Sequence, residues 1–161
     1  MARLLRNVTK PKWEARDWMA AGDVPADALT DLRADHNELS VWRLEPDDLA
    51  SLSMVLAALA SSRQRLDKLD YTLFDEAILP KISVKCVKSD GSTPHPAANG
   101  ALHRDLTELT AQKVVRIAVE MMPMERVRVP EKEVRRLLRD ALEKGALDRE
   151  RIDPRLLSEL K

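Results

Sequence analysis

The strongest constraint on the fold is an amphipathic pattern between Pro130 and Gly145. Apolar side chains recur there at intervals of three and four residues, which places them on one face of an α-helix. These side chains are Val134, Leu137, Leu138, Ala141 and Leu142. Proline suits the first turn of a helix, and a glycine just past the last turn favours its end. We therefore predict a helix over residues 130–144 that packs its apolar face against a core.

Shorter repeats of the same kind predict further helices. Leucines recur at helical spacing from Leu49 to Leu59, behind Asp47 and Asp48, which can cap a helix. Residues 105–122 open with a D-x-x-E pattern typical of a capping box. A last short helix is expected from residue 153 onward, where an aspartate precedes a proline.

Three segments carry patterns typical of β-strands. They are residues 39–44 (LSVWRL), residues 82–88 (ISVKCVK) and, as a short edge strand, residues 126–129 (RVRV). Residues 66–79 fit a helical face or a strand, and their length favours a helix. The sum predicts an α+β fold, a predominantly helical single domain with a small sheet of two or three short strands.

The pattern also predicts how the chain is divided. Residues 1–22 lack a regular repeat and contain Pro11, so we expect an irregular N-terminal arm. Residues 23–161 are expected to form one globular, helix-rich domain. Residues 89–101, with two glycines and two prolines, form the longest expected loop, and loops of that length tend to be functional or mobile.

Composition narrows the function classes. Lys and Arg number 27 and so do Asp and Glu, and a net charge of zero argues against a surface that is basic throughout. No run approaches the roughly 18 apolar residues of a membrane-spanning helix, so no membrane partner is expected. A single cysteine, Cys86, excludes an intramolecular disulfide. These features favour a cytoplasmic protein, and the abundance of Arg, Ala and Leu is compatible with a bacterial source.

One cluster is a candidate ligand site. His103, Arg104 and Asp105 follow the long loop at an expected helix N-terminus, where free backbone amides favour an anion. His103 would act there as an acid or a base near neutral pH, and Arg104 would add donors. The competing interpretation makes Asp105 a helix cap, Arg104 a solvated side chain and His103 a cover for the core.

Motifs for nucleophilic catalysis, glycine-rich phosphate loops and metal ligation are absent from the sequence. The three histidines and one cysteine lack the spacings of zinc sites, and four glycines leave little room for a phosphate loop. We therefore expect no metal and no cofactor. The lack of a converging catalytic set favours a protein that is not an enzyme, without settling the matter.

The predicted helix over residues 130–144 also carries a basic stripe. Lys132, Arg135, Arg136 and Arg139 share the face opposite the leucines, and such a stripe could track phosphates. The same pattern is typical of the solvent-facing side of any amphipathic helix. No aromatic residues are interleaved with the stripe for base stacking.

The N-terminal arm carries two tryptophans, Trp13 and Trp18, among basic residues. Tryptophan is a frequent anchor of protein interfaces, so the arm could dock on another subunit. The alternative is that both rings fold back onto the core of their own domain. Five basic side chains and one acidic one lie in residues 1–16, whereas thirteen acidic and five basic ones lie in residues 17–80. This asymmetry suits charge-guided docking.

Together these observations predict a non-catalytic protein-interaction module. It would be a regulatory or accessory subunit, of the antitoxin or immunity kind, that acts by surface complementarity on another protein. Its expected contact residues are Trp13, Trp18, Arg135, Arg136 and Arg139. Two alternatives stay open: a small enzyme or ligand-binding domain that uses the 89–101 loop with His103, Arg104 and Asp105, and a nucleic-acid-associated protein that uses the basic helix. Leucine-rich helices also permit a homo-oligomer. Deleting residues 1–20 is expected to weaken partner capture and leave the core folded.

Overall fold

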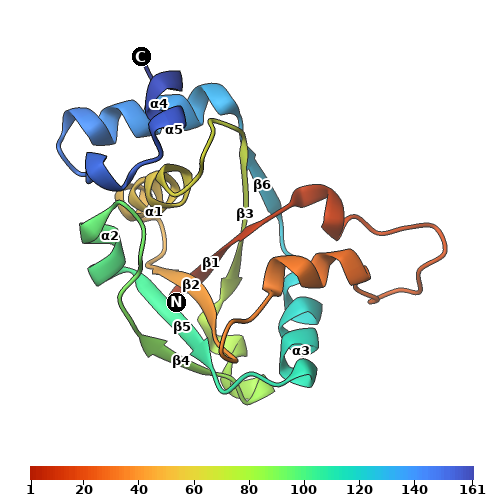
Figure 1. The fold of residues 1–161 in the computed structure, drawn as a ribbon. Coiled ribbons are helices and arrows are strands. Elements are labelled where there is room, and N and C mark those ends of the chain that lie inside the picture. Colours follow the sequence, from red (N-terminus) through yellow and green to blue (C-terminus); the bar gives the residue numbers. More distant parts are fainter. The chain divides into compact units, whose positions relative to one another are not determined.

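A computed structural model describes residues 1–161 and resolves the chain into two compact units (Figure 1). Each unit is assembled from three separate stretches of sequence. Unit 1 comprises Met1–Pro46, Asp70–Lys88 and Arg104–Val127. Unit 2 comprises Asp47–Leu69, Ser89–His103 and Arg128–Lys161. Residues far apart along the chain therefore meet within the same unit.

The principal feature of the fold is a six-stranded antiparallel sheet in the order β4-β5-β2-β1-β3-β6. Its strands are β1 (Arg3–Val8), β2 (Leu39–Leu44), β3 (Leu69–Asp75), β4 (Lys85–Lys88), β5 (His103–Thr107) and β6 (Arg126–Val129). Strand β1 lies inside the sheet and pairs antiparallel with both β2 and β3, so that Leu5 lies opposite Trp42 and Leu73. The first residues of the chain are thus integral to the sheet.

The prediction of a predominantly helical domain with two or three short strands is wrong. Strand β2 has the bounds that the sequence predicts, and β4 and β6 also lie in predicted strand segments. The strands β1 and β5 were not predicted, and β3 lies within residues 66–79, where a strand was the less favoured of two alternatives. Side chains on both faces of β3 are buried, so no alternation of apolar and polar residues marks it as a strand. The prediction of an irregular segment is likewise wrong for residues 3–8, which form β1.

The helix predicted from the D-x-x-E pattern starts later than expected. Residues 103–107 form β5, and the helix α3 (Ala111–Met121) begins behind Thr110, whose hydroxyl accepts a hydrogen bond from Lys113 N at 3.2 Å. Asp105 and Glu108 have the spacing of a capping box, but Asp105 lies in β5 and Glu108 precedes the start of α3. Thr110 is the actual cap.

The core of unit 1 gathers side chains from the sheet, from α3 and from four short 3-10 helices. These 3-10 helices are η1 (Lys10–Trp13), η2 (Ala26–Leu32), η3 (Glu76–Ile78) and η4 (Pro80–Ile82). Among the most deeply buried side chains are Trp13, Leu32, Phe74, Leu106 and Ile117. Burying large apolar side chains of this kind is the main source of stability in such a unit.

Unit 2 is built from helices. They are α1 (Leu49–Ser61), α2 (Pro96–Ala101), α4 (Glu131–Glu143), the 3-10 helix η5 (Arg149–Arg151) and α5 (Pro154–Glu159). Helix α1 packs against α4 and α2. The predicted cap at Asp48 is confirmed, since its carboxylate accepts a hydrogen bond from Ser51 N at 2.9 Å. Helix α4 also matches its prediction, and Gly145 ends it with a φ of 67°.

None of the helices is both long enough and apolar enough to cross a lipid bilayer.

Candidate functional site

The three residues predicted as a ligand site lie in β5. His103 is only 6% exposed, and its Nδ1 lies 2.8 Å from the hydroxyl of Ser89. Asp105 accepts a hydrogen bond from the hydroxyl of Ser40 at 3.2 Å. Side chains alternate across a strand, so Arg104 points away from the side that its two neighbours share. The free amides of a helix N-terminus, which motivated an anion site, are not found at these residues.

The two tryptophans of the N-terminal segment have opposite environments. Trp13 is 1% exposed, and its indole nitrogen donates to a carboxylate oxygen of Asp31 at 2.9 Å. The guanidinium carbon of Arg126 lies 5.9 Å from the centre of the Trp13 ring, within the range of a cation–π contact. Trp18, by contrast, is 81% exposed. Trp13 is a core residue of unit 1, so Trp18 alone of the pair is accessible to a partner.

Two consecutive turns hold the loop that displays Trp18. In the first, Met19 N donates to the carbonyl oxygen of Arg16 at 3.0 Å. In the second, Asp23 N donates to the carbonyl oxygen of Ala20 at 3.2 Å, while Ala20 N donates to the Asp23 carboxylate at 3.0 Å. Figure 1 shows the loop, in red to orange, extending well beyond η1 and η2, the two 3-10 helices that flank it. The indole is therefore presented by hydrogen-bonded backbone.

Two arginines of the predicted basic stripe secure the C-terminal helix of unit 2. Arg135 donates to the carbonyl oxygen of Glu159. Arg139 donates to the carbonyl oxygens of Leu160 and Lys161, each at 2.9 Å. These carbonyls lie at the end of α5 and would otherwise lack helical partners. The two guanidinium groups thus act as C-terminal caps.

Arg136, the third arginine of the stripe, lies between two acidic side chains of the same helix. It forms ion pairs with Glu133 and Asp140, the latter at 3.0 Å. Lys132 is exposed and is the one cation of the stripe that makes neither an ion pair nor a side-chain hydrogen bond. Nucleic-acid binding by this helix stays a prediction, and three of its four cations already have protein partners.

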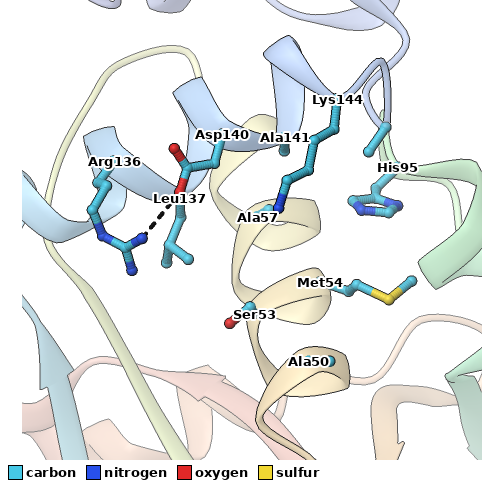
Figure 2. Close-up of a pocket in the computed structure, with 11 residues that line it drawn as sticks. Ala50, Ser53, Met54, Ala57, His95, Arg136, Leu137, Asp140, Ala141 and Lys144 are labelled. Carbon is cyan, nitrogen blue, oxygen red and sulfur yellow. Dashed lines mark hydrogen bonds and ion pairs between the residues drawn. The ribbon is translucent and has the colours of Figure 1, made fainter.

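A pocket of about 370 Å³ opens in unit 2 between α1 and α4 (Figure 2). Small and apolar side chains form most of its wall: Ala50, Met54, Ala57, Leu137, Ala141 and Ala146. Polar side chains complete it: Ser53, His95, Arg136, Asp140 and Lys144. Alanines on both helices leave the space between them unfilled. Volume and lining match those of pockets that hold small molecules.

His95 is the most deeply buried polar group of this pocket, at 3% exposure. Its Nδ1 accepts a hydrogen bond from Ala98 N at 3.3 Å, which places the ring proton on Nε2. The Nε2 group has no hydrogen-bond partner in the protein and is not sealed from the pocket. Burial lowers the pKa of His95 below its usual value of 6.5, so the ring is neutral at pH 7. The pocket thus contains a neutral N–H donor.

The segment that carries His95 is fixed by its own hydrogen bonds. The Asn99 side-chain oxygen accepts from Thr93 N at 3.2 Å and from the Thr93 hydroxyl at 2.6 Å, and its amide nitrogen donates to the Thr93 carbonyl at 2.7 Å. Asp148 N donates to the carbonyl oxygen of Pro94 at 2.8 Å. The predicted long loop is therefore an ordered structure that includes α2.

Charges at the pocket are unevenly compensated. Arg136 and Asp140 lie on α4 and form the ion pair drawn in Figure 2. Lys144, at the end of α4, extends toward α1 in the same view and makes no ion pair. A lysine at a helix C-terminus is favoured by the helix dipole, but its ammonium group stays available. The pocket therefore offers one uncompensated positive charge.

Sequence reasoning did not single out His95. The histidine stands alone in a segment rich in Gly and Pro, without a charged or nucleophilic neighbour to draw attention. The useful signal was Pro96, which suits the first position of a helix and so marks His95 as a cap. A capping histidine has one nitrogen occupied by the backbone and the other directed elsewhere.

No group of three or more His, Cys, Asp or Glu side chains in the structure is arranged to hold a metal ion. Comparison with known proteins found no matching family model, no similar curated protein and no similar solved structure. Function must therefore be inferred from the geometry of the chain itself.

Proposed function

We propose that this chain is a protein-interaction module that uses Trp18 as its anchor on another protein. The observation that carries the proposal is the exposure of Trp18, 81%, on a hydrogen-bonded loop. Tryptophan is the side chain most enriched among residues that dominate binding energy. Removing its apolar surface from water is favourable by about 25 cal/mol per Å², and that gain is left unused in the isolated chain.

The surroundings of Trp18 suit an interface of ordinary type. Met19 beside it is half-buried and adds apolar surface, while Arg16 and Asp17 supply charges of opposite sign. An apolar anchor inside a polar rim is the usual layout of a reversible protein contact. The two turns hold the loop before binding, which lowers the entropy lost on association. A regulatory or accessory subunit would act through such a surface without chemistry of its own.

Truncation cannot test this proposal. Deleting residues 1–20, which the sequence pattern alone favours as a test, would remove β1 from the interior of the sheet. Loss of binding would then report unfolding. A single substitution at an exposed side chain avoids this problem, because Trp18 contributes almost nothing to the core.

The experiment compares Trp18→Ala and Trp18→Phe with Val115→Ser, a substitution at an exposed apolar side chain of α3. Partners crosslinked to the wild-type chain are identified, purified and titrated by calorimetry. We expect Trp18→Ala to weaken binding by about tenfold or more, Trp18→Phe to weaken it less, and Val115→Ser to leave it unchanged. An affinity that is the same for Trp18→Ala and the wild type would overturn the proposal.

A further inference from the structure

We propose that the pocket between α1 and α4 binds a small carboxylate with an apolar body, held by the Nε2–H of His95 and the ammonium group of Lys144. The inference concerns unit 2 and does not depend on Trp18, which belongs to unit 1. It rests on the pocket's one deeply buried donor, its charge and its walls.

The pocket contains one deeply buried hydrogen-bond donor, the ring of His95. A polar group as buried as the His95 ring normally has a hydrogen-bond partner, because burial deprives it of bulk water. Its Nδ1 has such a partner in Ala98 N, and its Nε2 has none. The ring lines the pocket, its Nδ1 is occupied by Ala98 N, and its Nε2 carries the proton and is not fully buried, so the missing partner is an acceptor, such as a ligand oxygen.

The side chains that line the pocket carry a net positive charge. Lys144 supplies a positive charge that no carboxylate of the protein compensates. The other cation of the pocket, Arg136, is compensated by Glu133 and Asp140. Asp140 would also repel a second negative charge on a ligand. One net positive charge beside a neutral donor suits a singly charged carboxylate better than a doubly charged phosphate ester.

The walls of the pocket are mostly apolar. Apart from its few polar groups, the pocket is lined by alanines, by Met54 and by Leu137. Its volume of about 370 Å³ suits a body of several carbon atoms. Methionine adapts its shape to different apolar groups, so Met54 would tolerate either a short chain or a single ring. The ligand therefore combines one carboxylate with a compact apolar part.

The test uses four simple probes on the full chain: hexanoate, benzoate, hexyl phosphate and hexylamine. Each is added to about 20 mM, since ligands of so few atoms bind weakly. Binding is followed by the melting temperature and by the ¹⁵N and ¹H resonances of the His95 ring. We expect the two carboxylates to raise the melting temperature and to shift the Nε2 resonance. Hexylamine should do neither, and hexyl phosphate should bind more weakly than hexanoate.

Matched variants assign the binding to the pocket. Lys144→Met removes the charge but keeps the length of the chain, and Lys132→Met makes the same change on α4 outside this pocket. His95→Asn retains a capping side chain while withdrawing the ring donor. We expect about tenfold weaker hexanoate binding for Lys144→Met and for His95→Asn, and unchanged binding for Lys132→Met.

Several outcomes would overturn the proposal. One is the absence of any melting or resonance change with either carboxylate, which would leave water as the partner of Nε2. Another is equal binding of hexylamine, or tighter binding of hexyl phosphate than of hexanoate. A third is hexanoate affinity that neither variant at the pocket alters while circular dichroism shows both to be folded. A fourth outcome concerns peptides. If a peptide with a free C-terminal carboxylate binds more tightly than the same peptide with a C-terminal amide, and the free acids do not bind, then the carboxylate belongs to a protein and the proposal of a small ligand is overturned.

Discussion

Gly91 lies so close to Asn99 that a Cβ atom on residue 91 would come within 2.7 Å of the Asn99 side-chain oxygen. The two residues are also joined through the backbone, since Gly91 N donates to the carbonyl oxygen of Asn99 at 3.2 Å. That same side-chain oxygen accepts two hydrogen bonds from Thr93. A side chain at residue 91 would clash with Asn99. Asn99 could move away only by breaking its hydrogen bonds to Thr93, which hold the segment that carries His95.

Replacing Gly91 by alanine should therefore destabilise the protein. We expect Gly91→Ala to lower the free energy of unfolding by about 1–3 kcal/mol, because Asn99 must give up hydrogen bonds in a buried site. Gly100→Ala is the matched control, since nothing lies within 4 Å of its added Cβ and the residue is in α2. That variant should be neutral or more stable by about 0.5–1 kcal/mol. Urea unfolding measures both, and equal stabilities would contradict the expectation.

A second prediction concerns Asp31 in unit 1. Its carboxylate accepts hydrogen bonds from Thr9 N at 2.6 Å and from the Trp13 indole at 2.9 Å. Asp31→Ala leaves both donors without this partner, and the Trp13 side chain is buried, so we expect a loss of about 1–3 kcal/mol in the free energy of unfolding. Asp27→Ala, an exposed position of the same 3-10 helix, should change stability by less than about 0.5 kcal/mol. Guanidinium unfolding, followed by tryptophan fluorescence, measures the free energy of unfolding of both variants. Equal losses in the two variants would contradict the prediction.

The arginine caps of α5 give a third prediction. Arg139→Ala removes the donors that satisfy the carbonyl oxygens of Leu160 and Lys161. We expect amides of residues 154–161 to exchange about fivefold to tenfold faster with deuterium, corresponding to roughly 1 kcal/mol of local stability. Lys132→Ala, on the same helix without such contacts, should leave their exchange unchanged. Slow exchange of this segment in both variants would show that packing alone secures α5.

The fourth prediction follows from the lowered pKa of His95. Because burial disfavours the charged ring, the unfolded chain takes up the proton at a higher pH than the folded chain. The contribution of the buried, neutral His95 ring to the free energy of unfolding is fully present above the unfolded-state pKa, about 6.5. It is lost as the pH falls through the lower folded-state pKa. The groups that share the pocket are Ser53, Arg136, Asp140 and Lys144.

Urea unfolding between about pH 5 and pH 8 tests this dependence. The wild-type chain should lose stability toward pH 5, and His95→Asn should lose less. The difference in stability between the two proteins then depends on pH in that window. Parallel curves would mean that His95 titrates alike in the folded and unfolded states.

Part of this fold could be predicted from sequence because it depends on local pattern. Helix α4 is amphipathic, and its start and end are marked by Pro130 and Gly145, so its bounds follow from the residues. Strand β2 is marked by the β-favouring residues Val41 and Trp42 and closed by a proline. In these elements the residues that set the structure lie next to one another in the chain.

The rest depends on contacts between distant residues. Strand β3 is buried on both faces, and LDYTLFD fits a helical face as well as a strand until its partner β1 is known. Trp13 became a core residue through Asp31 and Arg126, neither of which its neighbours in sequence reveal. His95 gained its importance from a pocket that two other helices enclose. No local pattern contains such information.

Because each unit draws on three stretches of sequence, neither can be isolated by cutting the chain once. During synthesis, unit 1 stays incomplete until Val127 has emerged from the ribosome, long after its strand β1 has been made. A gene shortened to end before Val127 would remove residues from both units at once and so suggest a single indivisible activity. Assigning separate roles to Trp18 and His95 calls for point substitutions in the intact chain.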